Sequence, residues 1–196
     1  MQKVAKKEQR IDNVLLSLKK LDFLSRSQIQ TLHNLGSDRN AQKFLKSIDK
    51  YVHSFREGEN VYYLSKEGRE RVECNKVRKK TIQARHYLMR NSLYIAYGCP
   101  STWENEVALE VEGYTKIICD ANFEDNGRDH IIEVDYTQKM SVNKQKIEKY
   151  RVLSQLGVFE TPPMFIWMTT TEYRRKQLLK MCEGLDAQVF IITDFL

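Results

Sequence analysis

The sequence predicts an α+β protein, in which a mainly helical first part precedes an α/β part with a central mixed sheet. Three observations favour this organisation. Apolar residues recur every three or four positions through the first 50 residues, as in amphipathic helices. After residue 100, apolar β-formers alternate in short segments that are separated by helical patterns. Residues 1–100 hold 21 Lys and Arg against 10 Asp and Glu (net +11), whereas residues 101–196 hold 11 against 16 (net −5).

The composition excludes several classes of protein. With 196 residues, of which 41% are hydrophobic and 30% charged, the chain suits one medium or two small globular domains. No apolar run approaches the roughly 18–20 residues that span a bilayer, and the charged first ten residues lack a secretory signal. The four cysteines are scattered without metal-binding or disulfide spacing. We therefore expect a cytoplasmic protein with reduced cysteines and no membrane partner.

Three helices are predicted at the start of the chain. Residues 9–21 place apolar side chains on one helical face. Ser25 and Gln28 have the spacing of a capping box, which indicates the start of a second helix. Ser37 is a suitable N-cap for a third helix over residues 38–50.

A β-hairpin is predicted next. Residues 51–55 and 61–64 alternate and are rich in β-formers, and the turn-forming residues 56–60 separate them. Ser65 is then placed to cap a closing helix that runs to Val72. The order of three helices, a hairpin and a helix is typical of a winged helix-turn-helix.

The third helix of such a domain lies in the major groove of DNA. Arg and Lys can bind guanine edges or phosphates, and Asn and Gln can bind adenine. The alternatives are that these side chains are simply solvated, or that the domain binds protein. The expected DNA-binding residues are Ser37, Arg39, Asn40, Gln42, Lys43, Lys46, His53 and Arg56.

A helical pattern over residues 76–98 predicts a connecting helix, which ends at a Gly-Cys-Pro sequence. Its first five residues, 76–80, are strongly basic. They suit a second phosphate contact and a solvated helix start equally well. We therefore divide the chain into a winged-helix domain over residues 1–75 and an α/β domain over residues 76–196.

The second domain is expected to contain five strands and two helices around its mixed sheet. The long apolar run of the last strand favours a central position for it. The predicted strands are 102–111, 114–120, 130–135, 164–168 and 187–192, and the predicted helices are 143–156 and 172–182.

Three carboxylates mark the ends of predicted strands. Asp120 ends the second strand, and Glu133 and Asp135 on the third are two residues apart, so both point to the same face. Together they are candidate ligands for Mg²⁺, with Glu104 or Glu106 as a further oxygen donor. Such a metal ion would activate water and stabilise charge at a scissile phosphate.

This pattern resembles the PD-(D/E)XK nuclease-like fold. Asp120 and Glu133 match the first two motif positions, but Asp135 stands where the family has its catalytic Lys. The resemblance implies Asp120, Glu133 and a relocated lysine as catalytic candidates. Of the nearby lysines we select Lys139, with Lys144 and Lys146 as alternatives.

The order of motifs along the chain is similar to that of the replication-relaxation family of Gram-positive plasmids, phages and conjugative elements. The motifs are a helix-turn-helix, a helix with His86, a Trp-x-x-Glu strand (103–106), Asp120, Glu-Val-Asp (133–135) and a Lys–Tyr helix (146–150). The resemblance implies DNA binding near an origin or promoter.

The leading hypothesis is a non-enzymatic, sequence-specific protein that binds double-stranded DNA of a mobile genetic element in replication, mobilisation or transcriptional control. It needs no cofactor, and it suits a homodimer because two-fold sites match two-fold proteins. In this hypothesis Glu133 and Asp135 pair with Lys144 and Lys146, and the second domain is an inactive nuclease-like scaffold. One alternative is a Mg²⁺-dependent endonuclease. Another is an adaptor that recruits a replication or relaxase protein through the acidic half.

Overall fold

The computed structural model describes residues 2–195, with side chains from residue 4 onward. The chain forms two compact units, of which unit 1 ends at Asn91 and unit 2 begins at Ser92. The boundary lies within helix α5 (Ala84–Ala96), beyond the division expected after residue 75. It lies there because Arg90 and Asn91 donate hydrogen bonds to main-chain carbonyl groups of unit 1.

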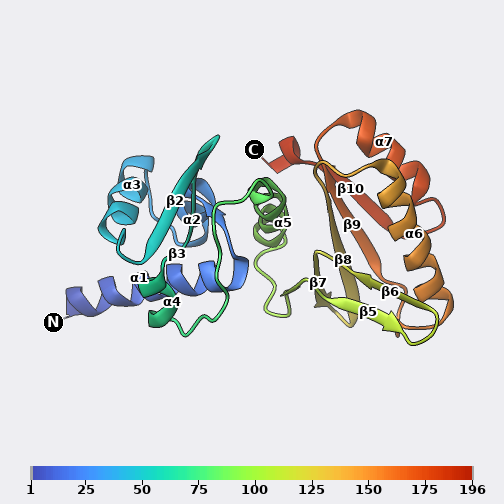
Figure 1. The fold of residues 1–196 in the computed structure, drawn as a ribbon, viewed down its shortest axis with the longest axis horizontal. Helices are drawn as coiled ribbons and strands as arrows, with labels where there is room; N and C mark the ends of the chain where they lie inside the picture. Colours follow the sequence, from blue (N-terminus) through green and yellow to red (C-terminus); the bar gives the residue numbers. More distant parts are fainter. Residues whose placement is uncertain (1, 196) are drawn as a thin grey trace. The chain divides into compact units, whose positions relative to one another are not determined.

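Unit 1 contains helices in the predicted order. They are α1 (Gln2–Leu21), α2 (Arg26–Leu32), α3 (Asp38–Ser47) and α4 (Lys66–Arg71). A three-stranded antiparallel sheet accompanies them, in the order β1 (Leu24–Ser25), β3 (Glu59–Leu64) and β2 (Val52–Glu57). Strands β2 and β3 form the predicted hairpin (Figure 1).

Serine side chains start three of these helices, as their sequence positions predict. The Ser25 hydroxyl accepts from the backbone N–H of Gln28, whose side chain accepts from the backbone N–H of Ser25, so the capping box is complete. Ser37 caps α3 and Ser65 caps α4 in the same way, through single hydrogen bonds. Each cap satisfies a helix N–H group that has no partner within the helix.

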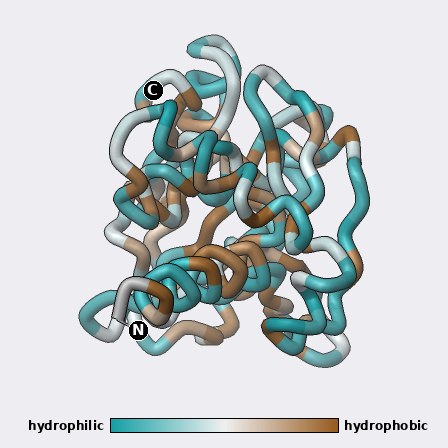
Figure 2. The backbone as a smooth tube through the Cα atoms, turned by 90° about the vertical axis from the view of Figure 1, so that its left-hand side faces the viewer, coloured by the Kyte–Doolittle hydropathy of each residue, from teal (hydrophilic) through white to brown (hydrophobic). Residues whose placement is uncertain are grey.

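The core of unit 1 forms where α1, α2, α3 and the sheet meet. Along α1, hydrophobic stretches alternate with hydrophilic ones, as the tube near the N label shows (Figure 2). The hydrophobic positions face the interior. Fully buried core residues include Val14, Leu15, Leu18, Leu24, Ile29, Leu45 and Ile48.

Unit 2 is built on a five-stranded mixed sheet, which confirms that part of the prediction. Its order is β10 (Ala187–Ile191), β9 (Met164–Thr169), β8 (Arg128–Asp135), β7 (Ala121–Asp125) and β4 (Glu104–Asn105). Strands β8, β9 and β10 run parallel, and β7 and β4 pair antiparallel. A separate hairpin joins β5 (Ala108–Val111) and β6 (Thr115–Ile118).

Two helices connect the parallel strands of this sheet, and a short 3₁₀ helix, Ile192–Phe195, follows β10. Helix α6 (Met140–Gln155) links β8 to β9, and α7 (Glu172–Met181) links β9 to β10. A core of Ile131, Phe165 and Trp167 from the sheet with Ile147 and Leu153 from α6 packs between the layers.

None of the helices that the structure describes has the length and the apolar character that a membrane-spanning helix requires.

Several sequence-based expectations about unit 2 are wrong. The last strand, β10, lies at the edge of the sheet rather than at its centre, where β8 lies. Strand β7 was not predicted, although Asn126 and Gly127, which form the tight turn before β8, are a strong hairpin signal. The predicted strand over residues 102–111 is divided into β4 and β5.

The connecting helix is also shorter than expected. Residues 74–81 are neither helix nor strand, and α5 begins only at Ala84. Ile82, which we expected on the apolar face of that helix, is 94% exposed. The helical spacing of the sequence is overridden because Lys76 and Arg78 of this segment form ion pairs with Asp22, which follows α1.

Candidate functional site

Asp120 lies immediately before β7, where pairing with β8 ends. Its backbone N–H donates to the carbonyl oxygen of Ile132 at 3.1 Å, and its own carbonyl oxygen accepts from the N–H of Glu106 at 3.0 Å. The N–H of Val134 donates to the Asp120 carboxylate at 2.7 Å. The Asp120 side chain therefore takes the place of a main-chain acceptor, which fixes it beside β8.

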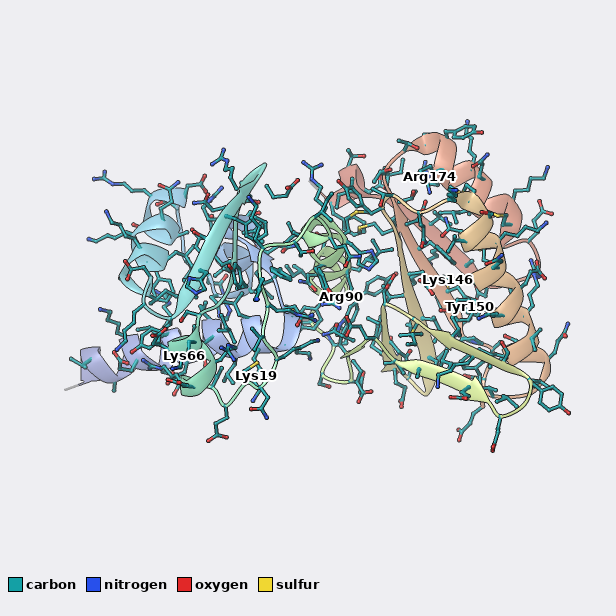
Figure 3. All side chains as sticks on the ribbon, in the orientation of Figure 1. Lys19, Lys66, Arg90, Lys146, Tyr150 and Arg174 are labelled. Carbon is teal, nitrogen blue, oxygen red and sulfur yellow. The ribbon has the colours of Figure 1, made fainter. Side chains whose placement is uncertain are left out.

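Glu133 on β8 is completely buried. One carboxylate oxygen accepts from the ammonium group of Lys146, and the other accepts from the Tyr150 hydroxyl at 2.5 Å. Lys146 and Tyr150 are four residues apart on α6, so they lie on the same face of that helix and point to the sheet (Figure 3). This arrangement satisfies both oxygens of a carboxylate that would otherwise be costly to bury.

Burial, together with an excess of negative charge, makes Glu133 hold its proton tightly, and the same negative charge makes Lys146 hold its own. Burial, together with the negative charge of Asp120, raises the pKa of Glu133 to about 8, against the opposing effect of Lys146 and Tyr150. Burial alone would lower the pKa of Lys146, but the charges of Glu133 and Asp120 raise it overall. Two carboxylates thus share one ammonium group, and both shifts favour the protonated forms.

Asp135 follows on the same face of β8 but makes different contacts. The Arg174 guanidinium from α7 binds both of its carboxylate oxygens, at 2.7 and 2.5 Å. Asn143 of α6 and Thr169 of β9 donate to the same carboxylate at 2.8 and 2.7 Å. Arg174 also donates to the carbonyl oxygen of Gln138 at 2.7 Å. Asp135 therefore ties both helices to the sheet.

The structure selects among the candidate lysines. Lys146 contacts Glu133, whereas Lys139, our candidate from the sequence, is exposed at the N-cap of α6. Lys144 is exposed on the same helix. Only the register of α6 decides this outcome, because Lys146 shares a helical face with the buried residues Asn143 and Tyr150.

The three-carboxylate metal site is not assembled as expected. Among the residues that the structure describes, no group of three His, Cys, Asp or Glu side chains is placed to hold a metal ion. Asp135 is occupied by four donors, and Glu104 and Glu106 are exposed. Both oxygens of Glu133 already accept hydrogen bonds from Lys146 and Tyr150, so a cation bound by Asp120 and Glu133 would have to displace one of these donors.

Unit 1 holds the residues that we expected to bind DNA. Helix α3 buries Ala41 and Leu45, and its opposite face is polar. Ser37 is exposed, and its hydroxyl caps α3. The other residues predicted on this helix are all exposed, namely Arg39, Asn40, Gln42, Lys43 and Lys46.

The β2–β3 hairpin carries the remaining two predicted residues. His53 and Arg56 are exposed on β2, and the His53 ring packs against Tyr63 with ring centroids 5.5 Å apart. Glu59 at the start of β3 accepts from the N–H of Ser27 at 3.0 Å and from its hydroxyl at 2.5 Å. These bonds fix the hairpin to the first turn of α2.

Sequence reasoning missed a buried ionic cluster in unit 1. Asp22, 3% exposed, has its carboxylate within 3.1 Å of Lys76, 2.8 Å of Arg78 and 3.4 Å of Arg90. The basic residues lie more than 50 positions from Asp22 in the sequence. No local pattern reveals such a pairing, and the same holds for Arg174 and Asp135 in unit 2.

Comparison with known proteins adds the following similarities. The model of the replication-relaxation family matches residues 15–166 of this chain. The crystal structure of protein VC1899 from Vibrio cholerae matches at 13% identity and a TM-score of 0.44. That match covers 95% of this chain and 53% of the other, so this chain spans about half the length of VC1899. Comparison with curated proteins gives no match.

Proposed function

The chain belongs to the replication-relaxation family, and we propose that it binds double-stranded DNA of a mobile genetic element in a sequence-specific manner. In this proposal it acts in replication, mobilisation or transcriptional control, and unit 1 is a winged helix-turn-helix. The family description itself names replication.

The observation that carries the proposal is the exposed face of α3. A helix whose apolar side is buried presents two amide, one guanidinium and two ammonium groups to solvent. These are the groups that read base edges and bind phosphates in the major groove. The net charge of +11 over residues 1–100 favours a polyanionic partner for this unit.

The surrounding structure holds this face in position. Arg26 pairs with Asp38 in the first turn of α3 at 2.9 Å, and the same guanidinium lies 3.6 Å from Glu59 of the hairpin. Helices α2 and α3 and the hairpin are thereby connected through one arginine. A rigid arrangement of this kind lowers the ordering cost of binding.

The experiment is a fluorescence-anisotropy titration with duplexes from the origin and promoter regions of the element that encodes the chain. Arg39→Ala and Lys43→Ala should each weaken binding by about 1–3 kcal/mol where a base contact is lost. Lys66→Ala, at a 74% exposed side chain on α4, is the control for loss of one positive charge. Equal affinities for the wild type and both α3 variants would refute the proposal.

A second candidate function is a Mg²⁺-dependent endonuclease, and the observation that favours it is the Lys146–Glu133 contact beside Asp120. Lys146 supplies the cation that the sequence motif lacks at position 135. Asp120 and Glu133 would hold the metal ion, which would activate water and stabilise charge on a scissile phosphate. Lys146 would place a positive charge beside these ligands.

Incubation of plasmid DNA with the protein and Mg²⁺ or Mn²⁺ tests this candidate. Asp120→Asn preserves an acceptor for the N–H of Val134 but removes the charge, so it should abolish cutting without unfolding unit 2. Lys146→Gln should also abolish cutting, whereas Lys139→Gln should leave it unchanged. Cutting that survives Asp120→Asn would contradict the role of Asp120, and absence of cutting by the wild type would exclude the candidate.

A further inference from the structure

The segment between α4 and α5, residues 72–83, carries four basic residues within positions 76–80. It has no regular secondary structure between residues 74 and 81, yet it is fixed at its start. The Lys19 ammonium group on α1 donates to the carbonyl oxygen of Val72 at 2.8 Å (Figure 3).

The middle of the segment is fixed by Asp22. The buried carboxylate pairs with Lys76 and with Arg78. It also pairs with Arg90 of α5, which follows the segment in the sequence. The Arg78 guanidinium also lies over the Tyr87 ring, 5.3 Å from its centroid. The backbone at residues 76–78 is therefore held in place although it is not helical.

This anchoring divides the basic residues into two sets. Lys76 and Arg78 meet Asp22, whereas Lys79 and Lys80 are exposed. The Lys80 ammonium group lies 5.9 Å from the centroid of the Phe55 ring on β2. The exposed pair thus lies beside the hairpin that we interpret as the wing.

Acidic residues of the hairpin do not cancel this positive charge. Glu57 pairs with Arg85 at 2.6 Å, and Glu59 is bound by Ser27 and lies near Arg26. Arg56, between them, is exposed. The hairpin and the segment beside it therefore present uncompensated positive charge to solvent.

We propose that Lys79 and Lys80 form a second contact with the DNA phosphate backbone, next to the hairpin and separate from the contact made by α3. The proposal rests on the DNA-binding function proposed above. Because Lys76 and Arg78 hold the neighbouring backbone in place, less conformational freedom is lost when a phosphate binds here than on a freely moving segment. They add affinity without reading sequence.

The test measures affinity for a mixed-sequence DNA duplex as a function of salt. Each phosphate contact contributes about 0.9 to the slope of log K against log salt. The variant Lys79→Gln/Lys80→Gln should therefore lose about 1.8 of the slope, which corresponds to about 30-fold weaker binding at 0.15 M salt and about 3-fold at 0.5 M. Lys79→Arg/Lys80→Arg should bind as the wild type does.

The matched control is Lys6→Gln/Lys7→Gln, which removes the same charge from two adjacent exposed lysines on α1. Its slope should stay within about 0.5 of the wild-type value if the contact is local. An unchanged slope in the Lys79/Lys80 variant, or an equal loss in the Lys6/Lys7 variant, would overturn the inference while DNA binding itself stands. No binding of any duplex by the wild type would overturn both proposals.

Discussion

The ammonium group of Lys146 on α6 donates to the carboxylate of Glu133 on β8, a side chain that has no exposed surface. This contact joins the helix layer to the sheet at the point where Asp120 also lies. It has consequences for stability that are independent of whether the cluster cuts DNA.

Removal of the lysine should leave the buried carboxylate without its cation. We expect Lys146→Met to destabilise unit 2 by about 3 kcal/mol at pH 9, above the Glu133 pKa of about 8, which is the scale for a buried ion pair that loses one partner. Glu133→Gln should restore much of this loss in the double variant, because no charge then remains to be neutralised. Urea unfolding of the single and double variants measures both effects. Additive losses in the two single variants would contradict the pairing.

The pH dependence of stability should carry the signature of Glu133. Its pKa in the folded protein, about 8, lies above the ordinary value of 4.5, so the folded state binds a proton that the unfolded state releases. The resulting stabilisation is complete below pH 4.5 and is lost as the pH rises through 8. Thermal unfolding between pH 5 and pH 9 should therefore show a smaller decline in Glu133→Gln than in the wild type. Parallel curves would show that Glu133 releases its proton normally.

Asp22 should be important for unit 1 through both its charge and its backbone. Desolvation by burial raises the pKa of Asp22, but the positive charges of Arg78, Lys76 and Arg90 outweigh this effect and lower the pKa overall. The ionised carboxylate therefore stabilises the folded unit, and this stabilisation is lost as the pH falls through the pKa of Asp22 in the folded protein. Asp22→Asn should cost about 3 kcal/mol, because Arg90 is 1% exposed and would lose its anion.

Asp22→Ala provides the comparison for this prediction. Residue 22 has φ of +70°, a conformation that Asn tolerates and Ala does not. The alanine variant should therefore be less stable than the asparagine variant by about 1 kcal/mol. Equal stability of the two variants in urea would show that the backbone conformation contributes nothing.

Gly68 should be intolerant of any side chain. It lies in α4, where a Cβ atom would come within 2.0 Å of the Tyr51 carbonyl oxygen. Gly68→Ala should thus force α4 away from the hairpin and cost about 3 kcal/mol or more, despite the higher helix propensity of alanine. Glu70→Ala, at an exposed position of the same helix, is the control and should change stability by less than about 0.5 kcal/mol. A more stable Gly68→Ala protein would refute the close approach.

The sequence predicted local features of this fold better than distant pairings. Ser25, Ser37 and Ser65 cap their helices as expected because an N-cap depends only on the next three residues. The prediction that β10 is a central strand is wrong because strand order depends on which strands pair. An apolar run is compatible with the centre of a sheet and also with an edge that is covered on both faces.

In the candidate site, too, local features could be predicted from the sequence and distant pairings could not. The spacing of Glu133 and Asp135 predicts that both side chains point to the same face of the strand, and in the structure both contact helix α6. The choice of Lys146 over Lys139 needed the register of α6 against β8, which no local pattern gives. Arg174 was not predicted because its partner, Asp135, lies 39 positions away.

The boundary between the two units lies within α5. Its position determines where the chain can be cut into separate fragments and where recombination could exchange one unit for another. A fragment that ended at residue 75 would lack Lys76, Arg78 and Arg90, and would leave the Asp22 carboxylate buried without a cation. We therefore expect the first unit to need residues up to Asn91 in order to fold. Because the same helix continues into the second unit, exchange of either unit between proteins requires a compatible α5, and recombination at the apparent linker would be selected against.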